Sequence, residues 1–282
     1  MGEVLLNGRA LPLIWVLQFP RLTSPNGQVN SADQSRPAYP YRTTTGVVYA
    51  IDGQRVLKHF YDIDEGAEER KALERLGSHP NIIGYLGEGD SNSIVLERGI
   101  PLLQLAETDD IWVQNHRTWI RDVADGLQYM HDKGIVHGDI GCENLVVVEN
   151  RLKIIDFEGC GIDGEEARAG YKWYNRQGSA VDIHSDIFAY GCVIYQLLTG
   201  KPTFYDLVEV DDKKKIAQDR YARHIFPDVQ SLPFSSVMLG CWTGQFKSMG
   251  EVLAALDALH SKATPRVFDV DHIEDDEEEQ QT

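Results

Sequence analysis

The order of apolar and polar residues between positions 41 and 97 predicts a small region rich in strands. Residues 46–51 and 56–60 have the composition of strands, and Asp52-Gly53 between them is typical of a hairpin turn. Residues 94–97 predict a further strand. We therefore expect these segments to form a small β-sheet region.

One amphipathic helix is predicted between these strands, over residues 62–77. Asp62 and Glu65 have the spacing of a capping box, in which two side chains bond the free backbone amides at the start of a helix. Apolar side chains recur at helical spacing on one side of the segment, namely Ala72, Leu73 and Leu76. The first region is thus expected to be a set of strands with a single helix.

The remainder of the chain has the periodicity of helices, apart from short strands predicted at 145–149 and 152–155. Apolar residues recur at helical spacing over 119–132. Residues 186–199 are apolar almost all round, which predicts a buried helix. A capping box at Ser248–Glu251 predicts the start of one more helix. The whole pattern predicts an α+β fold with a small β-rich lobe before a larger helical lobe.

The charge of the chain narrows the range of partners. Its 282 residues include 44 acidic and 27 basic ones, for a formal net charge of −17. This balance argues against nucleic acid, which needs a clustered basic surface, and against docking on an anionic membrane. Eight acidic residues and no Lys or Arg fall between positions 268 and 282, so the rest of the chain has 27 basic against 36 acidic residues, or −9. We expect a disordered acidic tail over 266–282.

Composition also suggests where the folded part begins. A stretch rich in Ser, Asn, Gln and Pro covers residues 22–40 and predicts a linker, so we expect an N-terminal extension over 1–40. The first lobe is then expected over 41–97 and the second over 98–265. The four cysteines lack the spacing of a zinc site, and the apolar run at 11–19 is too short to cross a bilayer. These features favour a soluble protein of the cytoplasm or the nucleus.

Three polar residues in the middle of the chain have the types and spacing of a phosphoryl-transfer site. Asp139 and Asn144 lie five residues apart, and Asp156 follows after one hairpin. One carboxylate can orient a hydroxyl group and accept its proton, while an amide and a second carboxylate can hold Mg²⁺ against the phosphates of a nucleotide. Upstream, Lys58 on a predicted strand and Glu69 on the following helix have the types and order of a phosphate-binding ion pair.

With these residues in this order, the chain resembles the eukaryotic protein kinase family over residues 41–260. The H-x-D-x-x-x-x-N and D-F-G motifs of the family match residues 137–144 and 156–158, with Glu158 in place of the glycine. Three shorter segments are also similar to family motifs, namely His79–Ile83, Asp186–Gly191 and Cys241-Trp242. In lacking the arginine of the first motif and in having a glutamate at the end of the second, the chain resembles divergent kinase-like proteins of fungi. The resemblance implies a bilobal kinase-like fold that uses ATP and Mg²⁺ to phosphorylate a protein.

The resemblance also implies a role for each matching residue. Asp139 would be the catalytic base, with Asn144 and Asp156 as the magnesium ligands. Lys58 would grip the α- and β-phosphates, and Glu69 would hold Lys58 in place. These roles come from the family and not from the spacing of the residues.

The same resemblance implies a pocket for the adenine ring of ATP. Its lining would come from the glycine-rich loop, from strands above and below the ring and from the hinge between the lobes, at Gly46, Val48, Val56, Val146, Glu97 and Gly99. The valines would cover the two faces of the ring, and backbone groups of the hinge would bond its edge. Leu96 would be the gatekeeper residue just before the hinge.

Several positions depart from the family pattern. Tyr41 and Thr43 stand where the first two glycines of the loop belong, so the loop should cradle phosphates less closely. Gly141 replaces a lysine that would stabilise the transferring phosphoryl group, which should lower the rate. Glu158 places a negative charge beside the magnesium site. No Ser or Thr lies between positions 157 and 177, so we expect no switching by Ser/Thr phosphorylation there.

Three functions are compatible with the sequence. The first is an ATP-dependent protein kinase, with Ser or Thr favoured as acceptor and, because the body of the chain is mildly acidic, a basic protein substrate. The second is a pseudokinase that binds ATP or acts as a scaffold, which the altered loop, Gly141 and Glu158 favour. The third is a phosphotransferase of the aminoglycoside or choline type, because H-G-D at 137–139 and I-D-F-E at 155–158 resemble motifs of that family.

Overall fold

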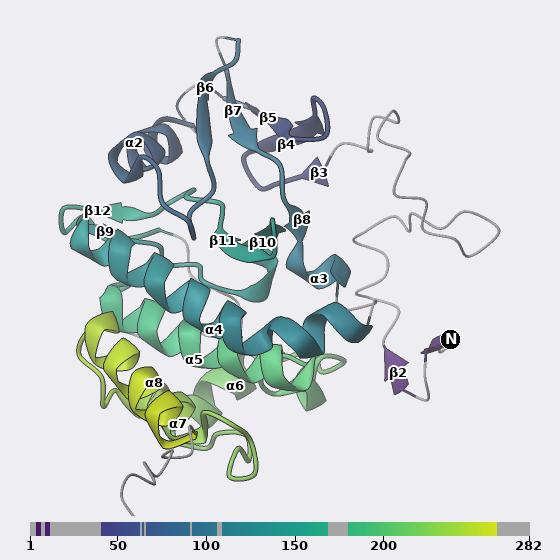
Figure 1. Cartoon of the computed structure of the whole chain (residues 1–282), viewed down its shortest axis with the longest axis vertical. Helices are drawn as coiled ribbons and strands as arrows, with labels where there is room; N and C mark the ends of the chain where they lie inside the picture. The colour runs from purple at the N-terminus through teal and green to yellow at the C-terminus, as the bar shows by residue number, and fades with distance from the viewer. Residues whose placement is uncertain are drawn as a thin grey trace, which may run out of the picture.

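The computed structural model describes residues 4–6, 9–11, 41–62, 64, 66–90, 92–105, 109–168 and 180–263. These residues form two lobes, a β-rich lobe with one helix and a larger helical lobe below it (Figure 1). The α+β class and the two-lobed organisation predicted from the sequence are therefore confirmed. The predicted linker at 22–40 and the predicted acidic tail at 266–282 lie outside the described residues.

The upper lobe is built on a five-stranded antiparallel sheet with the strand order β3-β4-β5-β7-β6. The strands are β3 Tyr41–Arg42, β4 Gly46–Ala50, β5 Arg55–Phe60, β6 Tyr85–Glu88 and β7 Ser93–Glu97. Lys58 pairs with Val48 on one side and with Ile94 on the other, so the three side chains lie on the same face of the sheet. The predicted hairpin of β4 and β5 is present.

Helix α2 (Ala67–Leu76) packs through its predicted apolar side, where the buried residues are Ala72, Leu73 and Leu76. The helix begins after the predicted start at residue 62, and its N-cap residue Gly66 has no side chain that could bond the free amides. The Asp62 carboxylate instead accepts the amide of Asp64, which closes a turn ahead of the helix. The predicted capping box is therefore wrong, and its second member, Glu65, lies outside the described residues.

The segment after α2 is anchored to the helical lobe. The hydroxyl of Tyr129, on helix α4 (Asp109–Asp132), donates to the carbonyl of Leu76 at 2.5 Å. Five residues after Leu76, Nδ2 of Asn81 donates to the carbonyl of Leu152 at 3.0 Å. The C-terminal end of α2 is thereby fixed to the second lobe.

The helical lobe is centred on α5 (Ile183–Thr199), which contacts both α4 and α7 (Ser235–Thr243). Side chains of α5 are buried on nearly every side, so the predicted buried helix is confirmed. The helix begins before the predicted residue, because Asp182 caps it. The Asp182 carboxylate accepts the amides of His184 and Ser185 at 2.9 and 3.3 Å.

Helix α4 begins well before the predicted start at residue 119, and Trp112 attaches its first part to α5. The Nε1 atom of Trp112 donates to a carbonyl of α5 at 2.8 Å. The last helix, α8 (Met249–Ala263), has the predicted cap, since the amide of Glu251 donates to Oγ of Ser248 at 3.3 Å. The Glu251 carboxylate accepts the amide of the residue before Ser248 and not that of Ser248 itself. The capping box is thus present in a form displaced by one residue.

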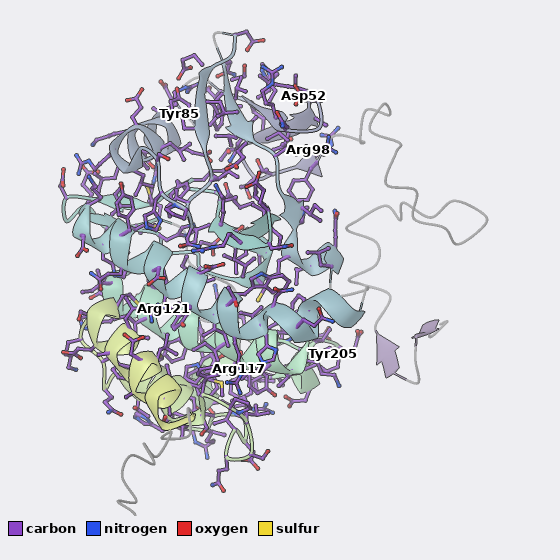
Figure 2. All side chains as sticks on the ribbon, in the orientation of Figure 1. Asp52, Tyr85, Arg98, Arg117, Arg121 and Tyr205 are labelled. Atoms are coloured by element: carbon purple, nitrogen blue, oxygen red, sulfur yellow. The ribbon has the colours of Figure 1, made fainter. Side chains whose placement is uncertain are left out.

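Ion pairs tie the helices of the lower lobe to one another. Arg121 of α4 bonds Asp125 at 3.0 Å and also reaches Asp257 of α8, on the face where Figure 2 labels Arg121. The buried carboxylate of Asp122 pairs with Arg151 at 2.9 Å. Because several of these groups are partly exposed, each surface pair adds little stability, and their main effect is to fix the register of the elements.

Shorter elements connect the helices, namely β8 Ile100–Pro101, α3 Leu102–Leu105, β9 Ile135–Val136, β10 Leu145–Val148, β11 Arg151–Ile154, β12 Gly161–Ile162, α6 Lys213–Ala222 and the 3₁₀ helices η1 Cys142–Asn144 and η2 Tyr205–Leu207. Strand β10 pairs with β11 and β8, and β12 pairs with β9. A separate hairpin joins β1 Val4–Leu6 to β2 Arg9–Leu11. Among the described residues, none of the helices combines the length and the apolar character that a membrane crossing needs.

One continuous apolar core extends through both lobes. The largest fully buried side chains include Trp119, Trp242, Tyr190, Tyr221, Phe60 and Phe157. Burying a side chain of this kind stabilises the fold by about 1.5–3 kcal/mol. Because Phe157 belongs to the core, the residues on either side of it, Asp156 and Glu158, are held at a fixed place above the helices.

Candidate active site

The structure brings Lys58 and Glu69 together between the sheet and the helix of the upper lobe. Lys58 lies on β5, and Glu69 lies in the first turn of α2. The Nζ atom of Lys58 is 2.6 Å from Oε2 of Glu69, and the two residues are only 3% and 1% exposed. A buried charge is costly unless it is paired, so each of these residues requires the other.

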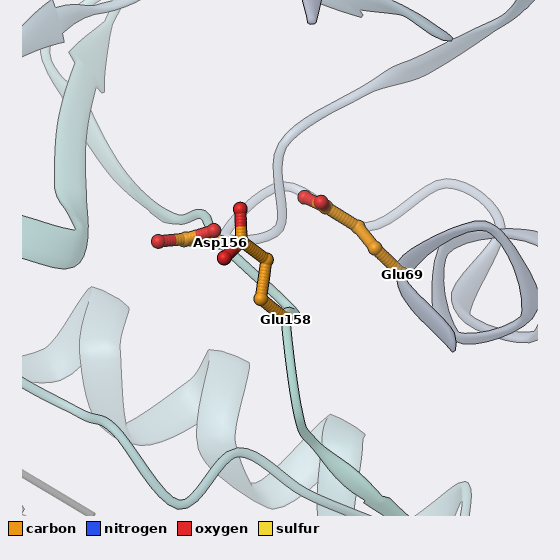
Figure 3. A group of neighbouring side chains, drawn as sticks. All are labelled: Glu69, Asp156 and Glu158. Atoms are coloured by element: carbon orange, nitrogen blue, oxygen red, sulfur yellow. The ribbon is translucent and has the colours of Figure 1, made fainter. Parts of the chain in front are cut away.

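Two more carboxylates reach the same ammonium group from the loop after β11. Nζ of Lys58 is 2.8 Å from Oδ1 of Asp156 and 2.7 Å from Oε1 of Glu158. Figure 3 shows the three carboxylates converging, with Glu69 on the helix and the other two on the loop. Their oxygens lie within 4.8 Å of one another. One positive side chain therefore faces three negative ones.

Glu158 also connects this loop to the upper lobe. Oγ1 of Thr43, in the turn between β3 and β4, donates to Oε1 of Glu158 at 3.2 Å. Burial raises the pKa of the Tyr41 hydroxyl, on β3, and the carboxylates of Asp156 and Glu143 raise it further. Thr43 and Glu158 both replace glycines of the family pattern, so two departures from that pattern are in contact. No sequence signal points to this contact, since the residues are 115 positions apart.

The crowding of charge changes the proton affinity of the buried pair. Burial alone would lower the pKa of Lys58, but the carboxylates of Glu69, Asp156 and Glu158 outweigh burial and raise it. The ammonium therefore stays charged at any physiological pH. Burial raises the pKa of Glu69 to about 7, although the Lys58 ammonium opposes this rise. The pair is thus fully ionised only above neutral pH.

Asp139 and Asn144 are in direct contact in the segment of the second lobe between β9 and β10. Nδ2 of Asn144 donates to the backbone carbonyl of Asp139 at 2.8 Å and to its carboxylate at 3.3 Å. These bonds use the nitrogen of the amide and leave its oxygen as the atom that a cation can approach. Burial raises the pKa of Asp139 above the usual range of an aspartate, while His137 opposes the rise.

The loop that carries Asp139 is held from below by Asp186, in the first turn of α5. The Asp186 carboxylate accepts the amides of His137 at 2.9 Å and Gly138 at 2.8 Å, and it bonds Nε2 of His131 at 3.0 Å. From the sequence, Asp186 was predicted only to begin a helix, and its role in anchoring the Asp139 loop was not predicted. Its signal is a carboxylate inside a helix that is apolar almost all round, because such a group needs several buried partners.

His137 is a positioning residue of the same loop. Its Nε2 atom bonds the carbonyl of Ile155 at 3.0 Å, and its Nδ1 atom accepts the amide of Asp139 at 3.2 Å. The ring also packs against Phe157, with 5.4 Å between the ring centres. With both nitrogens bonded to the backbone, the imidazole joins the Asp139 loop to the Asp156 loop.

The residues that the resemblance implies for adenine lie on elements of both lobes. Val48 and Val56 share the sheet face of Lys58, since Val48 pairs directly with Lys58 and Val56 is two positions before it. Leu96 pairs with Val56 on β7 and is almost fully buried. Val146 lies on β10 in the second lobe and is buried as well. Their part in nucleotide binding stays a prediction.

Close packing explains the two glycines of this group. A Cβ atom at Gly46 would lie 2.3 Å from the carbonyl oxygen of His59 on the neighbouring strand. A Cβ atom at Gly99 would lie 2.6 Å from the side chain of Val146. Both distances are shorter than any that real side chains show, so a larger residue would push the strands apart. Glycine is required here for packing, whatever else these residues do.

Glu97 fixes the end of β7 through both its side chain and its backbone. Its carboxylate bonds Nζ of Lys153 at 2.7 Å and accepts the amide of Gly84 at 3.1 Å. Its own amide donates to the carbonyl of Gly84 at 2.8 Å. The side chain is therefore committed to the fold, and only backbone groups near Glu97 can serve a bound base.

The donor set of the site fits a nucleotide with Mg²⁺. Asp156 uses one carboxylate oxygen on Lys58, so its second oxygen and the amide oxygen of Asn144 are the hard oxygen donors that Mg²⁺ takes. Asp156 has a φ of 67°, a left-handed conformation that is uncommon for a residue other than glycine. Lys58 supplies the positive charge that phosphate oxygens need. The residues present thus suit the group that the resemblance implies.

Comparison with known proteins agrees with this geometry. The sequence profile described as "Protein kinase domain" matches residues 42–237. The matched segment runs from β3 into α7 and therefore contains the Lys58 cluster, the Asp139 loop and Asp186.

Individual relatives are distant and longer. Mitogen-activated protein kinase kinase kinase 1 of Arabidopsis thaliana is 27% identical over 204 residues, which are 64% of this chain and 33% of the relative. Serine/threonine-protein kinase PknB of Mycobacterium leprae is 25% identical over 219 residues, 67% of this chain and 35% of the relative. Cyclin-dependent kinase F-4 of Oryza sativa subsp. japonica is 27% identical over 205 residues, 67% of this chain and 43% of the relative. The chain thus spans less than half the length of these relatives.

Proposed function

Because the chain belongs to the protein kinase family, we propose that it is an ATP-dependent enzyme that transfers the γ-phosphate of Mg-ATP to a hydroxyl group of a protein. The observation that carries this proposal is the ion pair of Lys58 with Glu69 and Asp156, at 2.6 and 2.8 Å, together with the contact of Asp139 and Asn144. Phosphoryl transfer from a nucleotide uses groups of these types.

In the proposed reaction each residue has one task. Lys58 binds phosphate oxygens, and Glu69 keeps its ammonium in place. Asp139 accepts the proton of the attacking hydroxyl, and its raised pKa makes it a stronger base than an ordinary aspartate. Asn144 and Asp156 hold the cation, and Mg²⁺, when bound, neutralises the charge of the phosphates.

We propose Ser or Thr of a basic protein segment as the acceptor. The names of relatives such as the serine/threonine-protein kinase of Mycobacterium leprae support a Ser/Thr acceptor. The charge of −9 on residues 1–267 supports a basic substrate, because an acidic surface attracts cationic peptides.

Transfer of ³²P from [γ-³²P]ATP to peptide mixtures tests the proposal, with wild type compared with Asp139→Asn. We expect label on Ser or Thr with wild type and a rate lower by about 100-fold or more in the variant, because proton transfer to a positioned base contributes that much. A thermal shift with Mg-ATP should be present in both proteins. Asp132→Asn makes the same chemical change at an exposed position of α4 and should leave the rate unchanged.

Equal transfer by wild type and Asp139→Asn would contradict the assigned base. Amino-sugar and choline acceptors form a second arm of the assay, and labelling of these molecules but of no peptide would favour the small-molecule phosphotransferase.

A pseudokinase is the second candidate, and the position of Glu158 is the observation that favours it. Its carboxylate lies 2.7 Å from Lys58, the residue that the enzyme needs for phosphates. A thermal shift with Mg-ATP, combined with transfer no greater than that of Asp139→Asn, is the result expected of this candidate.

A further inference from the structure

The carboxylate of Glu158 lies between two groups, one assigned to the phosphates of ATP by the proposed reaction and the other by the resemblance to the family's glycine-rich loop. One is the ammonium of Lys58, at 2.7 Å. The other is the turn between β3 and β4, whose Thr43 hydroxyl is 3.2 Å from the same oxygen of Glu158. A phosphate group held by Lys58 and covered by this turn would lie where the Glu158 carboxylate now lies. The carboxylate of Glu158 thus occupies the position expected for a phosphate group of the nucleotide.

We propose that Glu158 is an internal competitor of the nucleotide phosphates, which must displace its carboxylate from Lys58 and from the turn at Thr43. This inference rests on the proposed nucleotide site and adds a determinant of how strongly that site binds polyphosphate.

The crowding of oxygens around Lys58 supports the competition. Three carboxylate oxygens already lie within 2.6 to 2.8 Å of its Nζ atom, and Nζ donates a hydrogen bond to the one from Asp156. A phosphate oxygen can therefore come within bonding distance of Nζ only after one carboxylate has moved away.

Glu158 is the carboxylate best placed to move. Glu69 is 1% exposed and belongs to a helix whose far end is fixed to the second lobe. Asp156 lies two residues after the end of β11 and is a proposed cation ligand. Glu158 has the longer side chain of the two loop carboxylates, and its second contact is a neutral hydroxyl group, so its displacement breaks one ion pair and one hydrogen bond to a neutral donor.

The charge of the cluster makes the competition depend on a divalent cation. One ammonium and three carboxylates leave a surplus of two negative charges when all are ionised. A polyphosphate that approaches without a cation is repelled by this surplus, and the low dielectric of a buried site strengthens the repulsion. Removing the charge of Glu158 should therefore help free nucleotide more than it helps the magnesium complex.

Titration of the full chain with a fluorescent ADP analogue, with and without Mg²⁺, tests the proposal. Glu158→Gln keeps the size of the side chain and removes its charge. We expect it to bind the magnesium complex about tenfold more tightly than wild type, or about 1.4 kcal/mol, with a larger gain in EDTA. Glu74→Gln removes one charge from an exposed position of α2 and should change the Kd by less than about twofold.

Two further measurements make the outcome decisive. Thr43→Val removes the other partner of Glu158 and should also tighten binding, by about two- to threefold, even if Glu158→Gln folds poorly. In the nucleotide-free protein, mass spectrometry of acetimidate-labelled lysines should show faster modification of Lys58 in Glu158→Gln than in wild type.

The results separate this proposal from the proposed function. Nucleotide binding by wild type that neither variant strengthens overturns the competition and leaves the kinase assignment standing. Equal labelling of Lys58 in wild type and Glu158→Gln counts against it in the same way. Absence of nucleotide binding in every protein overturns both proposals.

Discussion

At the scale of single residues, the protonation of Glu69 links the site to the stability of the fold. When all groups are ionised, Glu69, Asp156 and Glu158 share the single positive charge of Lys58. Burial raises the pKa of Glu69 to about 7, so this residue takes up a proton as the pH falls below neutrality. Protonation removes one of the surplus negative charges from the buried cluster.

We expect the stability contributed by Glu69 to fall as the pH rises from 4.5, its ordinary pKa, to about 7. In this window the unfolded chain has released the proton while the folded chain retains it, so the free energy of unfolding decreases with pH. Urea denaturation of wild type and Glu69→Gln at about pH 5 and about pH 7.5 measures the effect. The free energy of unfolding of Glu69→Gln, relative to that of wild type, should be higher at about pH 7.5 than at about pH 5.

Glu74→Gln, on the exposed side of the same helix, is the control for that comparison. Its free energy of unfolding should follow that of wild type at both pH values. If the difference between wild type and Glu69→Gln is the same at both, Glu69 does not titrate in this window.

Sequence reasoning reaches part of this cluster. A lysine on a strand, a glutamate on the next helix and an aspartate after a hairpin follow a known order, and the structure does bring Lys58, Glu69 and Asp156 together. The contact of Glu158 with Thr43 is different, because it depends on the left-handed backbone at Asp156 and on the approach of two lobes. Neither property is encoded in a local pattern of residues.

At the scale of elements, α5 organises the second lobe and the loop of Asp139. Its first turn places Asp186 beneath the backbone of His137 and Gly138, while Asp182 caps the helix one turn earlier. The two aspartates are four positions apart, yet one is buried in the site and the other is exposed at the surface. The same helix start therefore offers a matched pair of substitutions.

We expect Asp186→Asn to lower the free energy of unfolding by about 2–4 kcal/mol, because two backbone amides lose a charged acceptor in a buried place. Phosphoryl transfer should fall with it, since the Asp139 loop loses its anchor. Asp182→Ala removes only the helix cap and should cost about 1 kcal/mol. Urea denaturation and the ³²P assay measure both variants. If Asp186→Asn lost no more stability and no more phosphoryl transfer than Asp182→Ala, the anchoring role would be refuted.

Elements with one clear apolar face were predictable, and others were not. Helix α5 and the hairpin of β4 and β5 have strong patterns, and they are found close to their predicted positions. Helix α6 was missed because only Ala217 and Tyr221 of its ten residues are buried, so its apolar stripe is too narrow to see. Strand β6 was missed because Gly87, with a φ of 129°, interrupts its alternation. Tertiary contacts decide such elements.

At the scale of the whole molecule, the acidic character is unevenly distributed along the chain. Residues 268–282 account for eight of the 17 net negative charges, and they follow the last described helix, which ends at Ala263. The packed core of both lobes is made by residues before that point. The overall charge therefore says more about solvation of the chain than about the site.

Removal of residues 268–282 should change the net charge from −17 to −9 and leave the melting temperature within about 2 °C of wild type, because a solvated acidic segment buries no apolar surface. Differential scanning calorimetry measures this. A stop after residue 253 is the control, since it deletes the buried Leu256 of α8 and should unfold the lower lobe. A large loss of stability on removing 268–282 alone would show that the segment packs on the domain.

The hydrogen bond from Tyr129 to the carbonyl of Leu76 fixes the C-terminal end of helix α2, so the helix can tilt only about that end. Glu69 lies seven residues from the fixed end, a distance of about 10 Å at 1.5 Å per residue. A tilt of only about 10° would therefore carry its carboxylate through about 2 Å, enough to separate it from Lys58. The N-terminal end of this helix is held by the ion pairs of Glu68 with Arg168 and of Arg70 with Glu88. A change that breaks these two pairs would therefore also decide whether Lys58 keeps Glu69 as its partner.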